Sequence, residues 1–166
     1  MKKYTVRLIC VFILALITLS CFTACGGGDW RNDVAVSSIS AAIGAKIPVP
    51  DGYYSPDSDY LEFYFEGADA IVDEYTIQMS ATSTNINQFG IFRVKDGEAE
   101  NMKAICESYI ETSKARWVAQ ANYIASEHPK MEGAEIRVFG NYVVYTMLTT
   151  ADKATAFATV EELLKK

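Results

Sequence analysis

Two residues of the chain have side chains suited to nucleophilic or acid–base chemistry. His128 is the single histidine, and a Ser-His-Asp or Cys-His catalyst would need it beside a nucleophile. Cys106 is the candidate nucleophile, but it falls on the apolar side of a predicted helix, where a cysteine behaves as a small core residue. We therefore expect a core cysteine, a surface histidine and no catalytic residues, with a Cys106–His128 dyad as the alternative.

Two aspartates in the stretch PDSDYLE have the spacing of calcium ligands. An EF-hand loop requires D-x-[DN]-x-[DN]-G, whereas Leu61 and Glu62 occupy the last two of these positions after Asp57 and Asp59. A zinc site would need several cysteines or histidines. The sequence also has neither a GxxxxGK[ST] nor a GxGxxG motif. Helix capping explains both aspartates better than metal binding, so we expect no metal and no cofactor.

Seven aromatic residues gather between positions 53 and 75, with acidic residues among them. The aromatic residues are Tyr53, Tyr54, Tyr60, Phe63, Tyr64, Phe65 and Tyr75, and the acids are Asp57, Asp59, Glu62 and Glu66. Exposed tyrosines beside carboxylates would bind a cationic peptide or a sugar, and Tyr53, Tyr54, Tyr60 and Tyr64 are the candidates for such a surface. The alternative, which we favour, places the phenylalanines in the core and the tyrosines half-buried at its rim.

The N-terminus has the three parts of a secretory signal. Three basic residues, Lys2, Lys3 and Arg7, precede a predominantly apolar stretch of 12 residues from position 8 to position 19. This stretch is short for a membrane-spanning helix, which needs about 20 apolar residues, although an uncleaved anchor helix is the alternative. In either case the charges before the stretch place the remainder outside the cytoplasm. We expect a signal peptide over residues 1–24.

The segment FTAC, which ends at Cys25, resembles the lipobox of bacterial lipoproteins. In that motif a small residue, here Ala24, precedes a cysteine that becomes the diacylglyceryl-modified N-terminus, and Phe22 departs from the usual leucine. Cys21 is the alternative acceptor. We favour Cys25 because three glycines follow it and a glycine run forms a flexible tether. Two acyl chains hold a protein stably on a membrane, so we expect a lipid anchor on Cys25, with a tether over residues 25–32.

Without the signal peptide the chain is strongly acidic. Loss of residues 1–24 removes three basic residues and no acid, which leaves 12 basic and 21 acidic residues and a net charge of −9. Such a charge disfavours nucleic acid as a partner, because phosphate binding needs a basic surface. The remaining 142 residues suffice for one domain, which we expect over residues 33–166. Cys106 has no second cysteine there, so the domain has no internal disulfide.

The residue patterns in this domain alternate between helices and pairs of strands. Helices are expected over 33–44, over 60–68 (with a half-buried strand as the alternative), from 97 to 128, and from 149 onward. Strands are expected over 74–81, over 88–95, and on both sides of Gly140-Asn141 within 134–148. Residues 46–59 are expected to form a loop, and His128-Pro129 to end the long helix. The order predicts an α+β fold, with a small antiparallel sheet of two hairpins packed by one long helix and by N- and C-terminal helices.

Two stretches, FGIFRVKDGEAENMKAICESYIE and AEIRVFGNYVVYTML, resemble a family of domains of unknown function found in lipoproteins of Gram-positive bacteria. The resemblance extends from about Tyr75 onward and includes the signal with its lipobox. It implies a lipoprotein with a small α+β domain. Because the shared motifs are patterns of core and turn residues, the resemblance transfers no active site.

These observations favour an outward-facing, lipid-anchored protein of the cell envelope. Its domain would be a non-catalytic binding or accessory module that contacts the membrane through its anchor and an envelope protein or a small ligand through its surface. An envelope hydrolase that uses carboxylates is the alternative, and two carboxylates converging in a cleft would support it. A solute-binding protein of a transporter is disfavoured by size, because such proteins close two lobes around a ligand.

Overall fold

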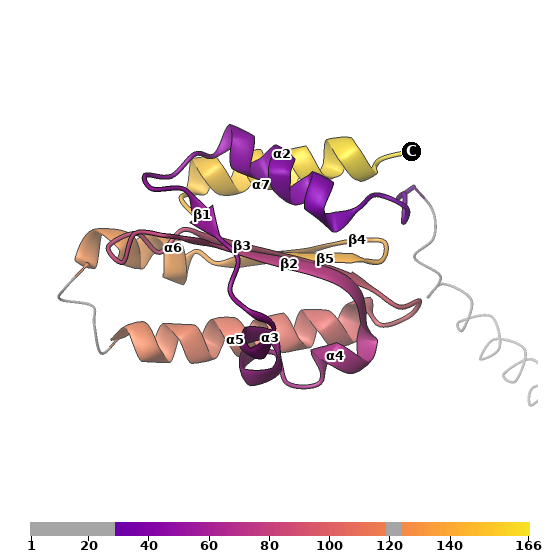
Figure 1. Ribbon diagram of the computed structural model, residues 1–166, viewed down its shortest axis with the longest axis horizontal. Helices are drawn as coiled ribbons and strands as arrows, with labels where there is room; N and C mark the ends of the chain where they lie inside the picture. Colours follow the sequence, from indigo (N-terminus) through magenta and orange to yellow (C-terminus); the bar gives the residue numbers. More distant parts are fainter. Residues whose placement is uncertain (1–28, 119–123) are drawn as a thin grey trace, which may run out of the picture.

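The computed structural model describes residues 29–118 and 124–166, which build one antiparallel sheet with helices on both of its faces (Figure 1). This arrangement confirms the expected α+β fold. The expected signal peptide over residues 1–24 and the lipid attachment at Cys25 lie outside the described residues. In the described ranges, no helix is long and apolar enough to cross a membrane.

The sheet has five strands, and every neighbouring pair is antiparallel. The strands are β1 (Tyr53–Tyr54), β2 (Val72–Ser80), β3 (Gln88–Val94), β4 (Glu135–Phe139) and β5 (Tyr142–Met147). Their spatial order is β1-β2-β3-β5-β4. The hairpins β2–β3 and β4–β5 are the two that the sequence predicts. The second hairpin turns at Gly140, whose φ of 61° favours glycine.

Strand β1 lies inside the segment 46–59, which the sequence predicts to be a loop. It pairs with the Met79–Ser80 end of β2 and extends the sheet by one edge strand. Proline cannot donate a hydrogen bond to a sheet, so Pro50 and Pro56 on either side limit β1 to a short edge position.

Helices lie on both faces of the sheet (Figure 1). One face carries α2 (Val36–Lys46) and α7 (Thr150–Leu164), and the other carries α3 (Ser58–Tyr64), α4 (Ala68–Ile71) and α5 (Ala99–Val118). The helix predicted over 60–68 corresponds to α3 and the start of α4. The predicted start of α7 is confirmed, because the Thr149 hydroxyl oxygen accepts a hydrogen bond from the Asp152 amide at 3.2 Å and caps the helix.

The segment after α5 differs from the single helix predicted from 97 to 128. A 3-10 turn (Ala125–Glu127) leads into a separate helix, α6 (His128–Glu132), and residues 119–123 lie outside the described part. Pro129 occupies the first turn of α6, where a missing amide hydrogen costs nothing. The expectation that His128-Pro129 ends the long helix is therefore wrong, because α6 begins there.

Each face of the sheet has its own apolar core. Phe92, Cys106 and Tyr145 are buried between the sheet and α5, whereas Val144 and Phe157 are buried between the sheet and α7. Neighbouring residues of one strand enter different cores because side chains alternate across a strand. The expected core position of Cys106 is confirmed, and burial raises the pKa of its thiol.

The two ends of the described chain meet beside the β4–β5 turn. Trp30 forms an isolated bridge with Lys165, and the Lys166 amide donates a hydrogen bond to the Asp29 carbonyl oxygen at 3.0 Å. The Trp30 ring packs edge-on against Phe139, with 5.2 Å between ring centroids. Residues 29 and 30, which we expected in the tether, thus contact the domain.

Candidate functional site

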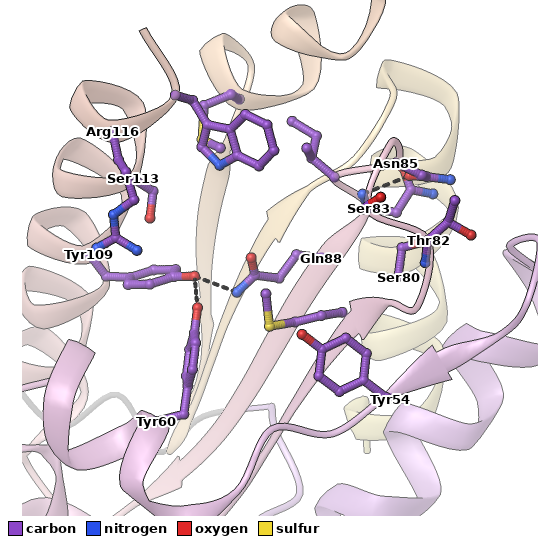
Figure 2. A pocket seen from close by; sticks show the side chains of 15 residues that line it. Tyr54, Tyr60, Ser80, Thr82, Ser83, Asn85, Gln88, Tyr109, Ser113 and Arg116 are labelled. Carbon is purple, nitrogen blue, oxygen red and sulfur yellow. Dashed lines mark hydrogen bonds between the residues drawn. The ribbon is translucent and has the colours of Figure 1, made fainter. Parts of the chain in front are cut away.

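A pocket of about 280 Å³ opens between the sheet and the C-terminal half of α5 (Figure 2). Its lining comes from β1, the end of β2, the loop 81–87, the start of β3, α5 and α6, with Tyr60 added from α3. The volume lies near the lower end of the range for small-molecule sites. The pocket is therefore large enough for one small ring and its substituents.

A hydrogen-bonded group of Gln88, Tyr60 and Tyr109 forms the floor of the pocket, and Tyr145 is buried directly beneath it. The side-chain nitrogen of Gln88 donates to the hydroxyl oxygens of Tyr109 and Tyr145, each at 2.6 Å. The hydroxyls of Tyr60 and Tyr109 lie 2.7 Å apart and share another hydrogen bond (Figure 2). Because both amide hydrogens of Gln88 are used, its orientation is fixed and its carbonyl oxygen points into the pocket (Figure 2).

The hydroxyls of Tyr60 and Tyr145 have raised pKa values and stay protonated at neutral pH. Burial raises the pKa of Tyr145 well above its usual value, and the neighbouring Tyr109 and Tyr60 add to the effect. Burial also raises the pKa of Tyr60, again with a contribution from Tyr109. Tyr60 thus offers the pocket a neutral hydroxyl, beside the uncharged side-chain amide of Gln88.

The α5 side of the pocket carries a cation and an aromatic ring. Arg116 is exposed at the rim, and its guanidinium carbon lies 4.8 Å from the centre of the Tyr64 ring, a cation–π contact. Trp117 is half-buried beside it, and the Ser113 hydroxyl points toward the pocket (Figure 2). Arg116 is the one charged side chain among the described lining residues.

A buried lysine fixes the opposite wall of the pocket. The Lys130 ammonium donates to a carboxylate oxygen of Glu127 at 2.6 Å and to the side-chain oxygen of Asn87 at 2.7 Å. The same Glu127 oxygen accepts the Ile86 amide at 3.0 Å. Lys130 itself is 9% exposed, so this cluster joins α6 to the loop 81–87 away from most of the solvent. The loop residues that line the pocket are held in place by it.

A second hollow, of about 610 Å³, lies on the opposite face of the sheet between α2 and β2. Small residues of α2 line it, together with Tyr53, and no charged side chain is among its described lining residues. The Tyr53 hydroxyl is buried without a hydrogen-bond partner in the described part of the chain. This hollow has fewer fixed polar groups than the pocket beside α5.

The four candidate tyrosines do not form one surface. Tyr54 and Tyr60 line the pocket, and Tyr64 lies beside it, with 4.5 Å between its ring centroid and that of Tyr60. Tyr53 lies on the other face of the sheet and packs against Phe89 at 5.3 Å. The division follows from strand geometry, because Tyr53 and Tyr54 are neighbours in β1.

The remaining residues of the aromatic segment also separate. Phe65 is buried as expected, but Phe63, also expected in the core, is 82% exposed. The interleaved acids Asp57, Asp59, Glu62 and Glu66 are exposed, and none of them lines either pocket. The tyrosines that reach the pocket are therefore not accompanied by carboxylates.

The side-chain caps expected at the start of α3 are absent. Asp57 occupies the N-cap position but makes no capping hydrogen bond, and Asp59 lies in the first turn. Within residues 29–118 and 124–166, no group of three His, Cys, Asp or Glu side chains lies close enough together to hold a metal ion. His128 is partly exposed on α6, with its ring nitrogen 4.0 Å from the Glu132 carboxylate.

Most of the residues that build the pocket were not identified from the sequence. Gln88, Tyr109, Ser113, Arg116 and Trp117 are among the residues that sequence reasoning missed. Two of them carry a signal in the sequence: Gln88 is an amide that precedes the apolar residues of β3, and Ser113 interrupts the apolar side of α5. A buried polar group needs a partner, so such residues mark sites of hydrogen bonding.

The comparison with protein families matches residues 55–148 to a domain of unknown function. The matched region runs from the end of β1 to the end of β5, so it contains every lining residue of the pocket beside α5 except Tyr54. Helices α2 and α7 lie outside it. No curated protein and no solved structure matches the chain. Because the match covers more than half of its length, the chain belongs to the family described as Domain of unknown function (DUF4358).

Proposed function

We propose that the protein is a lipid-anchored, outward-facing lipoprotein of the cell envelope whose domain binds a small polar ligand without changing it chemically. The observation that carries the proposal is the pocket beside α5, in which hydrogen bonds hold the polar groups of the floor in fixed orientations. Preorganised polar groups in a small concave site are typical of ligand recognition. The pocket also lies almost entirely within the matched family region.

The chemistry of the lining supports binding rather than catalysis. The described lining residues include no Asp, Glu, His or Cys. General acid–base catalysis most often uses His, Asp or Glu within hydrogen-bonding reach of the substrate, and a glycoside hydrolase needs two carboxylates. Serine hydroxyls such as Ser113 are weak nucleophiles without an adjacent base. The carboxylate-dependent hydrolase is therefore the less well supported function.

The anchoring part of the proposal rests on the N-terminal sequence. A signal-like segment precedes Cys25, and three glycines follow it. A diacylglyceryl group on Cys25 would hold the acidic domain on the membrane without a basic surface. Cys25 would then place the pocket outside the cytoplasm.

Fractionation of a bacterial host tests the anchor. Wild type and Cys21→Ser should be found in the membrane fraction, and mass spectrometry should find the acyl groups on an N-terminal Cys25. Cys25→Ser should carry no acyl group. Lipid on Cys21, or an unchanged modification in Cys25→Ser, would overturn the assignment of the anchor.

Native mass spectrometry of the detergent-purified lipoprotein tests the binding role. The protein is mixed with a dialysable extract of small molecules from the cell envelope, and the mass of any bound molecule is recorded before and after release. We expect one class of bound molecule with an unchanged mass. A bound molecule whose mass changes during incubation indicates catalysis, and a protein that retains none contradicts the binding role.

A further inference from the structure

We infer that the pocket beside α5 takes a single sugar ring that carries one carboxylate, an inference that rests on the proposed function. The argument uses the charge of the lining, the direction of its hydrogen-bonding groups and its size.

The charge of the pocket differs from that of the rest of the domain. The chain after residue 24 has a net charge of −9, yet the one charged side chain among the described lining residues is the cation Arg116. Glu127, close behind the wall, is paired with Lys130 at 2.6 Å. Charges elsewhere on the surface are screened beyond about 8 Å at physiological ionic strength. A cationic ligand would therefore be repelled by Arg116, with no carboxylate in the lining to offset this repulsion. An anionic ligand would be attracted by Arg116.

Arg116 is positioned to bind a carboxylate. Its guanidinium carbon lies over the Tyr64 ring, 4.8 Å from the ring centre, and no ion pair holds it in the part of the chain that the structure describes. A guanidinium keeps its edge free for hydrogen bonds when its face packs on a ring. A carboxylate binds that edge through two parallel hydrogen bonds, so Arg116 favours a planar anion over a neutral group.

The other polar groups match hydroxyls, which both donate and accept. The carbonyl oxygen of Gln88 is an acceptor aimed into the pocket (Figure 2). The side chains of Asn85, Ser83 and Ser113 add amide and hydroxyl groups around the opening. A ligand with several hydroxyls can satisfy acceptors and donors together, whereas a simple carboxylate such as acetate would leave the floor unpaired.

The shape of the pocket limits the ligand to one ring. Trp117 and Tyr54 place aromatic rings on two sides of a cavity of about 280 Å³. Aromatic faces bury the apolar face of a sugar ring, while the rim groups bind its hydroxyls. The fixed floor of Gln88 and Tyr109 closes the bottom, so a longer chain of sugars has no exit on that side.

Isothermal titration calorimetry on the detergent-purified lipoprotein tests the inference with three matched sugars. Glucuronate carries the carboxylate, glucose has the same ring without charge, and glucosamine carries a positive charge. We expect glucuronate to bind about tenfold more tightly than glucose, since the Arg116 contact contributes about 1.4 kcal/mol for that factor. Glucosamine should bind most weakly.

Two arginine variants assign this preference to the pocket. Arg116→Gln should lower glucuronate affinity to that of glucose and leave glucose affinity unchanged. Arg137→Gln is the matched control, because Arg137 also packs on a ring, 4.3 Å above Phe157, but on the other side of the sheet. It should leave both affinities unchanged, and the melting temperatures of both variants should show that they are folded.

Three results would overturn the inference. They are tighter binding of glucosamine than of glucuronate, a preference for glucuronate that persists in Arg116→Gln, and no binding of any of the three sugars at millimolar concentration. In the third case the proposed function survives if native mass spectrometry finds another unmodified molecule on the wild type. If it finds none, the proposed function fails as well.

Discussion

The side-chain nitrogen of Gln88 lies 2.6 Å from the hydroxyl oxygen of Tyr109, and this hydrogen bond joins strand β3 to helix α5 beneath the pocket. The same nitrogen bonds to Tyr145 on β5. The floor of the pocket is therefore also part of the contact between helix and sheet. Substitutions there should change ligand binding and stability together.

Replacing Gln88 by leucine should destabilise the domain. The hydroxyls of Tyr109 and Tyr145 lose their donor while they remain buried, which costs about 1–3 kcal/mol of unfolding free energy. Urea denaturation of the wild type and of Gln88→Leu measures the difference. Gln78→Leu is the control, because Gln78 bonds to Ser55 at the surface, and it should change stability by less than about 0.5 kcal/mol. Equal losses in the two variants would show that the floor bonds are not stabilising.

Replacing Gly90 by alanine should destabilise the domain for a steric reason. A Cβ atom at Gly90 would overlap the ring of Tyr145, which is fully buried and has no room to move. Such overpacking costs about 1–3 kcal/mol. In a double-mutant cycle, Tyr145→Leu should remove most of this cost, and the two substitutions should be strongly non-additive in thermal unfolding. Additive effects would mean that the Tyr145 ring is not the obstacle.

Replacing Lys130 by methionine should loosen the wall of the pocket. The mostly buried Glu127 would lose its cationic partner, and the expected loss of unfolding free energy is about 2–4 kcal/mol. Amide hydrogen exchange should rise in the loop 81–87, because its contact with α6 weakens. Lys114→Met is the matched control: Lys114 pairs with Glu111 at the same spacing but on the surface, and its loss should cost under about 1 kcal/mol. A loop whose exchange does not change in Lys130→Met contradicts the role of this cluster.

Stability should fall at alkaline pH through the buried tyrosines. In the unfolded chain a tyrosine ionises near pH 10, whereas burial raises the pKa of Tyr60 and Tyr145 in the folded state. Above about pH 10 the unfolded chain therefore releases protons that the folded chain keeps, and unfolding becomes more favourable by up to about 1.4 kcal/mol per pH unit for each tyrosine. Below about pH 10 these tyrosines are protonated in both states, and their contribution to the unfolding free energy is fully present.

Urea denaturation across this pH range measures the slope. Tyr60→Phe should make the decline above pH 10 shallower than in the wild type. Burial also raises the pKa of Cys106, so this thiol adds its own loss of stability, which starts at a lower pH than that of the tyrosines. Both proteins contain Cys106, so the difference between their slopes above pH 10 reports Tyr60. An identical slope in Tyr60→Phe would show that Tyr60 ionises alike in both states.

Local patterns predicted the elements whose formation depends on local interactions. Alternation of apolar and polar residues over 74–81 predicts β2, and Gly140 predicts the turn of the second hairpin. The spacing of Thr149 and Asp152 predicts the start of α7. In each case the residues that decide the structure lie within a few positions of one another. The pattern of apolar residues then indicates which face is buried.

The features that were missed depend on contacts between distant residues. Strand β1 has two residues, and its pairing with the end of β2 is set by the path of the chain between them. Gln88 bonds to Tyr109, 21 positions later on α5, and to Tyr145, 57 positions later on β5. Neither relationship appears in a local window. The aromatic residues from Tyr53 to Tyr64 are close in sequence, but the direction of each ring depends on strand β1 or helix α3, in which it lies.

The bridge between Trp30 and Lys165 fixes the start of the described chain at one end of the sheet. Trp30 lies beside the β4–β5 turn, at the end of the sheet where Arg93 pairs with Tyr142. Gln88 pairs with Met147 at the other end, and the seven residues of β3 separate the two ends by roughly 20 Å. With the proposed anchor on Cys25, the domain would be attached at the end of the sheet away from the pocket, and the opening would lie at the unattached end. There it would meet molecules that diffuse through the space outside the membrane rather than the lipids to which it is attached.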